Sequence, residues 1–194
     1  KPVNCIPILM LFFLCDKYVA AQTTIDSLRT QIYKAQNNKE KLTAAINFCR
    51  QWDSFTADTL SYYNKLIKQL ANKQNDRYGL LMADYFDAVF LFQKNKVDTA
   101  LALTLAGFQA FRQSVPYNDM YLQYYRLKGN ILLRKSQYDD VTRLNFELLK
   151  EAEAHKDTLG IALAYLGLGN VSNRMQKKEE SLQWYFKAMA MLPA

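Results

Sequence analysis

The sequence predicts an all-α protein in which antiparallel helix pairs stack into a solenoid with a period of about 40 residues. Only six residues are glycine and four are proline, which favours long helices. Gly129 stands 40 residues before Gly169, and an asparagine follows each glycine. Three turn triplets start 41 residues apart: Lys94-Asn95-Lys96, Lys135-Ser136-Gln137 and Gln176-Lys177-Lys178. Polar pairs that can cap the next helix separate the units: Asn75-Asp76, Asn118-Asp119 and Lys156-Asp157.

The fourth unit, residues 164–193, carries the most complete repeat motif. Tyr165 is followed by Leu168-Gly169, and Ser181 is followed by Tyr185 and then by Pro193, which ends the helix. This order resembles the tetratricopeptide (TPR) pattern W-x2-L-G-x2-Y…A-x3-F…P, with serine at positions 172 and 181 where tyrosine and alanine are usual. The resemblance implies a right-handed superhelical solenoid of antiparallel helix pairs. An ordinary helical hairpin is the alternative interpretation of this unit taken alone.

The predicted elements follow one another from residue 22 to the end of the chain. An opening helix covers residues 22–36, and four helical hairpins follow at residues 39–74, 76–114, 118–155 and 157–192. In the first hairpin, one stripe holds the apolar residues Leu42, Ala45, Ile46 and Cys49. Val115-Pro116 ends the second hairpin, because the residue before a proline disfavours the helical conformation. In the third, Met120, Tyr124, Leu127 and Ile131 recur at helical spacing. No Gly- or Ser-rich linker interrupts the series, which predicts one continuous array.

The first 21 residues have the order of a secretory signal peptide. A lysine precedes an apolar run from Ile6 to Cys15, and small residues end at Ala21, which predicts cleavage before Gln22. The run is too short to span a bilayer as a helix. A lipoprotein signal with Cys15 as the lipidated residue is the alternative. Cleavage would leave Cys49 as the one cysteine, so no internal disulfide is expected.

Charge and residue inventory argue against catalysis and against nucleic-acid binding. The formal net charge is +7, but the basic residues are dispersed among acidic ones rather than clustered. His155 is the only histidine, and no cysteine or histidine stands at metal-ligand spacing from it. We expect His155 to lie in the last turn of a helix, where a cation interacts favourably with the helix dipole. The sequence therefore predicts no enzyme, no metal, no cofactor and no nucleic-acid partner, with any membrane attachment supplied by segments outside this chain.

A polar stripe on the first helices of the repeats is the candidate binding surface. Arg126, Asn130 and Arg134 follow one another at intervals of four residues and share one helix face. Asn170 and Arg174 occupy the equivalent positions one repeat later, and Tyr85 and Phe92 would continue the surface in apolar form. Asparagine can hydrogen-bond a peptide backbone, and arginine can bind a carboxylate through two hydrogen bonds. These residues predict a groove for a protein or peptide, and solvated polar side chains without a ligand are the alternative.

The whole chain resembles the N-terminal region of bacterial TPR-containing signalling proteins. The residues that carry the likeness are the export signal, the opening Thr24-Ile25-Asp26-Ser27-Leu28, the 40-residue period and the Asn-Asp junctions. In that family a periplasmic TPR array precedes a membrane span and a histidine kinase or LuxR-type output. The resemblance implies an exported sensing or scaffolding module of a two-component system in a Gram-negative envelope. Two alternatives stay open: a free-standing secreted or lipid-anchored assembly factor for envelope or nutrient-uptake complexes, and a cytoplasmic TPR regulator.

Two expectations concern packing in the last unit. Gly169 should lie where two helices touch, whereas Gly160, near a helix start, should tolerate a larger side chain. The final helix carries large apolar residues, including Leu182, Phe186 and Met189. An array normally covers such a face with a further helix, so we expect an exposed apolar patch here and a continuation of the array beyond Ala194.

Overall fold

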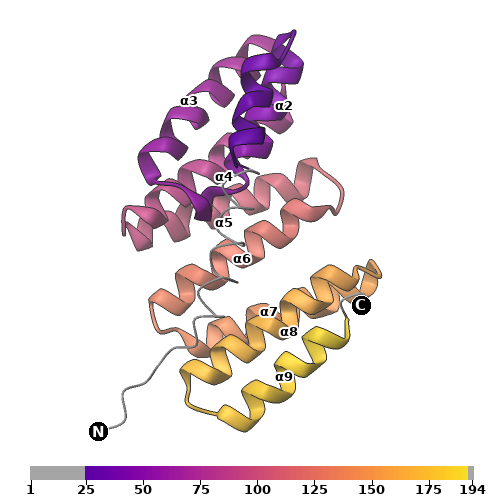
Figure 1. Ribbon diagram of the computed structural model, residues 1–194. Helices are drawn as coiled ribbons and strands as arrows, with labels where there is room; N and C mark the ends of the chain where they lie inside the picture. Colours follow the sequence, from indigo (N-terminus) through magenta and orange to yellow (C-terminus); the bar gives the residue numbers. More distant parts are fainter. Residues whose placement is uncertain (1–24, 192–194) are drawn as a thin grey trace, which may run out of the picture. The chain divides into compact units, whose positions relative to one another are not determined.

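A computed structural model describes residues 25–191, and all of the regular structure within that range is helical (Figure 1). Helical residues 25–34 precede α2 (Asn38–Cys49), the 3-10 turn η1 (Trp52–Ser54), α3 (Ala57–Gln74), α4 (Arg77–Gln93), α5 (Val97–Ser114), α6 (Asp119–Arg134), α7 (Tyr138–Ala154), α8 (Thr158–Arg174) and α9 (Lys178–Ala190). The chain forms two compact units, divided between Phe86 and Asp87 inside α4. The expected signal peptide at residues 1–21 lies outside the described residues. Within residues 25–191, no helix combines the length and the apolar character that crossing a membrane requires.

The repeated turn triplets end helices through a left-handed residue. Asn95, Ser136 and Gln176 have φ values of 60°, 57° and 63°, so the left-handed residue recurs after 41 and then 40 positions. One residue later, the backbone amides of Lys96, Gln137 and Lys177 donate to carbonyl oxygens five positions back, at 2.9, 3.0 and 2.9 Å. This is the Schellman arrangement, which satisfies carbonyl groups left open at a helix end. The three triplets therefore share one turn structure, which also occurs at Asn75 and Lys156.

The polar pairs between the repeats cap the helices that follow them, as the sequence predicts. Asp76 Oδ1 accepts a hydrogen bond from the Gly79 amide at 3.0 Å, and Asp157 Oδ1 accepts one from the Gly160 amide at 3.0 Å. At the middle junction the asparagine is the cap, because Asn118 Oδ1 accepts from the Met120 amide at 2.9 Å. Each cap satisfies an amide that has no partner inside its helix.

The first unit packs α2 against α3 around aromatic side chains. The Phe48 ring stacks on Phe55 with ring centroids 4.8 Å apart and meets Tyr63 at 4.5 Å. Asn64 Nδ2 on α3 donates to the Ala83 carbonyl of α4 at 3.0 Å, which fixes the beginning of α4 on this unit. Cys49 is buried, and burial raises the pKa of its thiol well above the usual range. This cysteine is a packing residue rather than a reactive thiol.

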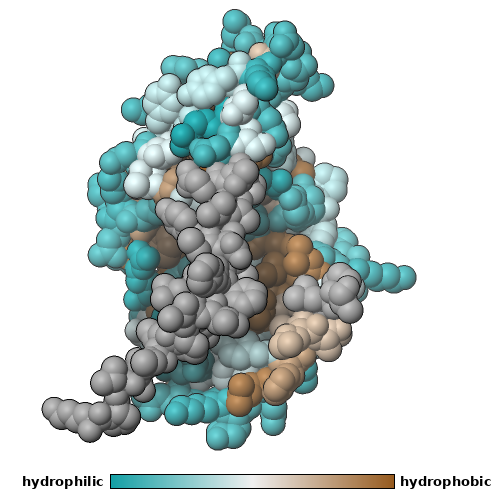
Figure 2. Space-filling model, viewed as in Figure 1, coloured by the Kyte–Doolittle hydropathy of each residue, from teal (hydrophilic) through white to brown (hydrophobic). Residues whose placement is uncertain are grey.

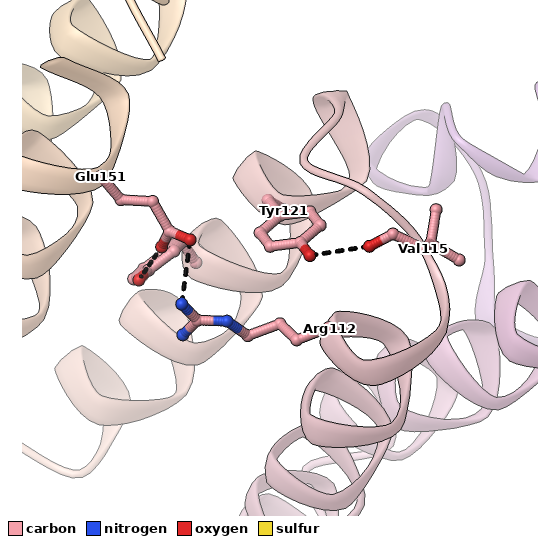
Figure 3. A network of polar contacts seen from close by, with 5 residues as sticks. Arg112, Val115, Tyr121 and Glu151 are labelled. Atoms are coloured by element: carbon pink, nitrogen blue, oxygen red, sulfur yellow. Dashed lines mark hydrogen bonds and ion pairs between the residues drawn. The ribbon is translucent and has the colours of Figure 1, made fainter. Parts of the chain in front are cut away.

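In the second unit each helix packs on its neighbours in the chain, and α6 also contacts α8. The interface of α5 with α6 is aromatic, with the Phe108 ring stacked on Tyr124 at 5.0 Å. A polar network ties α5 to α7 (Figure 3): Arg112 donates to Glu151 Oε1 at 2.9 Å, and the Tyr121 hydroxyl donates to the Val115 carbonyl at 2.9 Å. The same apolar and polar contacts hold α6 between its two neighbours.

The close approach expected at Gly169 is confirmed, but the expectation for Gly160 is wrong. A Cβ at Gly169 would lie 2.4 Å from Tyr185 Cε1, and Ser181 Oγ donates to the Gly169 carbonyl at 2.9 Å. A Cβ at Gly160 would lie only 2.7 Å from the Cβ of Ala152 on α7. Gly160 stands near a helix start, yet the capping turn brings that start directly against the end of α7.

The expected apolar patch is present on α9. Leu182, Phe186 and Met189 form one stripe and are 55, 66 and 66% exposed. Figure 2 shows hydrophobic residues gathered where Figure 1 places α9. The opposite face of α9 packs through Ser181 and Ala188, both buried.

Candidate functional site

The second unit contains a cavity of about 220 Å³ where α6 and α8 adjoin over α7. We call it the α6–α8 cavity. Its apolar lining consists of Leu122, Leu133, Val141, Leu148, Leu163 and Leu166. Its remaining lining consists of Tyr125, Arg126, Gly129, Asn130, Asn145, Gly167 and Asn170. An apolar cavity with a few polar groups is the usual form of a binding site for a small group or side chain.

A more open groove of about 610 Å³ adjoins this cavity. Asn130, Leu133 and Asn170 line both, and the groove adds Asn173, Arg174 and Gln176. Cavity and groove together make one continuous region, the α6–α8 surface. Leucines lie toward its cavity end, and amides with an arginine lie toward its groove end.

Four of the seven sequence-predicted site residues meet on the α6–α8 surface. Arg126 lines the cavity, Asn130 and Asn170 line both parts, and Arg174 lines the groove. The repeat register brings them together, since Asn130 and Asn170 follow equivalent glycines on neighbouring first helices of repeats. The other three residues, Arg134, Tyr85 and Phe92, lie elsewhere.

Arg134 serves the fold of the second unit rather than the groove. Its guanidinium carbon lies 3.9 Å from the centroid of the Phe92 ring, and its Nη1 donates to the Phe92 carbonyl at 2.8 Å. Phe92 is buried, and Tyr85, in the first unit, is buried with an exposed fraction of only 1%. Both aromatic residues therefore belong to the core rather than to the apolar surface expected from the sequence. The pattern of α4 is apolar on several faces, so spacing alone did not distinguish a core position from a surface one.

Asn170 is oriented by its neighbour on α9. The Tyr185 hydroxyl donates to Asn170 Oδ1 at 2.9 Å. With the oxygen engaged, the Nδ2 group is the part of the amide that can donate to a ligand on the α6–α8 surface. The contact also couples the candidate site to the packing of α9 on Gly169, because the same tyrosine ring covers that glycine.

One wall of the cavity is fixed by the network around Glu151. The Tyr125 hydroxyl donates to Glu151 Oε2 at 2.7 Å, and Arg112 Nη2 donates to the other carboxylate oxygen, Oε1 (Figure 3). Burial, and then the hydrogen bond to Glu151, raises the pKa of Tyr125 above its usual range. Tyr125 is therefore a neutral donor near pH 7, held in one position beside the cavity.

Sequence reasoning missed Asn145 and Gly167, which also line the cavity. Asn145 lies on α7 and is 8% exposed. A periodic signal marks its position: Asn64, Thr104 and Asn145 follow at intervals of 40 and 41 residues, and all three are buried polar residues. A search for polar residues at one repeat position of the second helices would have found it.

His155 stacks on an aromatic ring at the end of α7. The imidazole stacks on the Tyr117 ring with centroids 4.1 Å apart, and the Tyr117 hydroxyl donates to Asp157 Oδ2 at 2.8 Å. His155 is the C-cap of α7, which agrees with the expected last-turn position. No group of three or more histidine, cysteine or acidic side chains that could hold a metal occurs in the part of the chain that the structure describes.

Comparison with known proteins adds no relative: no family model, no curated protein and no solved structure matches this chain.

Proposed function

We propose that this chain is a non-catalytic module that binds an extended segment of a protein or peptide across the α6–α8 surface. The observation that carries the proposal is the convergence of Arg126, Asn130, Asn170 and Arg174 on adjoining cavities. The same four residues stand at equivalent or helix-spaced positions of two successive repeats in the sequence.

The side chains on this surface suit an acidic peptide with apolar residues. Arg126 and Arg174 supply guanidinium groups at its two ends, and a guanidinium pairs well with a carboxylate. Asn130 and Asn170 lie between them, where amide groups can bond the backbone of an extended chain. The leucines of the cavity offer a place for an apolar side chain, and the net charge of +7 favours approach of an acidic partner.

We further infer an architecture of the TPR type, a right-handed superhelix of antiparallel helix pairs. The support is the recurring left-handed residue at Asn95, Ser136 and Gln176 and the short turns between packed helices. Together with the export signal in the sequence, this architecture leads us to propose a periplasmic sensing or scaffolding role in envelope signalling. Export is tested by the N-terminal residue of the protein recovered from the periplasm, which should be at or near Gln22.

The binding proposal is tested with peptides selected from a random display library on the full chain. We expect the selected peptides to be rich in Asp and Glu and to lose affinity in Arg126→Ala and Arg174→Ala. A charge-assisted contact at the centre of an interface contributes about 2–5 kcal/mol when one partner is truncated. Lys150→Ala removes the same charge from an exposed position of α7 outside the α6–α8 surface and should bind like the wild type. Equal losses in all three variants would refute a specific site.

A further inference from the structure

Asn145 presents its side-chain amide oxygen to the α6–α8 cavity. Its Nδ2 donates to the Val141 carbonyl of the preceding turn at 2.8 Å, which fixes the direction of the amide. Its Oδ1 accepts no hydrogen bond from any group within residues 25–191. The side chain is 8% exposed and lines the cavity, so a group that enters the cavity meets this oxygen. A ligand that fills the cavity would remove water from this oxygen, so a donor on the ligand is needed to satisfy it.

Gly167 on α8 is what makes room for this amide. A Cβ at Gly167 would lie 1.8 Å from Asn145 Oδ1 and 2.4 Å from its Cγ, so any side chain there would displace the amide. Gly129, on α6, lines the same cavity, but a Cβ there would meet only Leu144 Cδ2, at 3.6 Å. Two glycines therefore line the cavity, and only the one at position 167 is required by the position of Asn145.

We propose that the α6–α8 cavity is a subsite for a tyrosine side chain of the bound peptide. Asn145 recognises the tyrosine hydroxyl group through a hydrogen bond. The inference rests on the proposed peptide-binding function. At about 220 Å³ the cavity is smaller than the roughly 300 Å³ at which pockets for whole small molecules begin, so it suits one side chain. Its leucine walls contact the ring, and Asn145 Oδ1 accepts a hydrogen bond from the hydroxyl group.

The same lining disfavours several other side chains. Serine and threonine are too short to fill the cavity. Lysine and arginine would bring a second cation next to Arg126, which lines the same cavity. Phenylalanine fits by size but would leave the Asn145 oxygen buried without a partner, and a site built to bond a hydroxyl strongly rejects the analogue that lacks it.

Small probes test the subsite without any peptide. Binding of p-cresol and of 4-methylanisole, which has a similar shape but no hydroxyl donor, is measured by protein-observed NMR on the full chain. We expect p-cresol to bind the wild type at least tenfold more tightly and to shift resonances of residues that line the cavity. Equal binding of the two probes, or p-cresol shifts confined to other parts of the chain, would overturn the proposal.

Variants test whether Asn145 is the residue that recognises the hydroxyl group. Asn145→Leu should bring the two probe affinities together, and Gly167→Ala should do the same by displacing the amide. Asn72→Leu makes the same replacement at an exposed position of α3, in the first unit, and should keep the preference for p-cresol. Thermal melts establish that each variant is folded. Should Asn145→Leu not fold, Gly167→Ala still decides the point: an unchanged preference in this variant counts against Asn145.

The library peptides separate this inference from the proposed function. Peptides that need Arg126 and Arg174 but bind equally well after Tyr→Phe replacement would refute the tyrosine subsite and leave peptide binding intact. Selective p-cresol binding with no peptide recovered would refute the proposed function and leave the subsite intact. Peptides whose tyrosine is required in the wild type and dispensable in Asn145→Leu are the result that we expect.

Discussion

The ring of Tyr185 lies directly on the backbone of Gly169, where a Cβ would come within 2.4 Å of ring atom Cε1. Gly169→Ala must therefore move α9 or the ring, and we expect a loss of about 1–3 kcal/mol in the free energy of unfolding. Gly129 stands one repeat earlier with 3.6 Å to its nearest neighbour, so Gly129→Ala should be nearly neutral or slightly stabilising, because alanine favours helix over glycine. Urea unfolding of both variants checks this contrast. Equal effects would show that the two glycines do not differ in packing.

Gly160→Ala should also be destabilising. Its Cβ would lie 2.7 Å from the Cβ of Ala152, an atom that cannot rotate away. The expected loss is again about 1–3 kcal/mol, from overpacking of a buried position. Ala152→Gly in the same chain should recover part of it, since the obstructing methyl is removed. An absence of coupling in this double-mutant cycle would contradict the contact.

Arg134 is predicted to affect stability and not binding. Arg134→Gln loses the guanidinium over Phe92 and its hydrogen bond to the Phe92 carbonyl. A cation over an aromatic ring contributes about 0.5–1 kcal/mol at an exposed site, so thermal melts should shift modestly. Titration of a library peptide should give the affinity of the wild type. Weakened binding with unchanged melts would place Arg134 in the site after all.

The α9 stripe should promote association between copies of the chain. Leu182, Phe186 and Met189 are all more than half exposed, and apolar patches of this kind are aggregation-prone. Replacing all three by glutamine should lower the concentration-dependent mass seen by light scattering while thermal melts change little. Leu105→Gln, which removes an exposed leucine from α5, is the control and should not affect the mass. A wild type that stays monomeric at high concentration would contradict the expectation.

Tyr125 makes the stability of the second unit depend on pH in the alkaline range. Its folded pKa lies above the unfolded value of about 10, because of burial and the hydrogen bond to Glu151. The stabilisation is therefore fully present below about pH 10 and is lost as the pH rises through the folded pKa. Tyr125→Phe should lower stability near pH 7 by about 1.5 kcal/mol, the lower end for a hydrogen bond to a charged group. Urea unfolding across this range should show the difference from wild type shrinking above pH 10, and a constant difference would argue against the bond.

Periodicity predicted the parts of this molecule that every repeat shares. The left-handed residues at Asn95, Ser136 and Gln176 and the caps at Asp76 and Asp157 are local structures, and their residue types follow from backbone conformation. The repeat register likewise brings Asn130 and Asn170, on α6 and α8, to one surface. Contacts between helices are harder to predict from the sequence. The Arg134 guanidinium packs on the Phe92 ring and Gly160 packs against Ala152, and both contacts depend on how neighbouring helices are placed. The spacing of Asn145 from Asn64 and Thr104 marks it as a repeated polar position, but its contact with Gly167 depends on the packing of α7 against α8.

The side-chain amide resonances of Asn130 and Asn170 report whether a peptide lies across the α6–α8 surface. Both groups lie on the cavity and on the groove, so a peptide bound across the α6–α8 surface must change their environment. Titration of a library peptide into the full chain should shift both side-chain NH₂ signals in proportion to binding, and the amide of Asn72, on α3 of the first unit, should stay unchanged. Saturable binding that shifts Asn72 and leaves Asn130 and Asn170 unmoved would contradict the account.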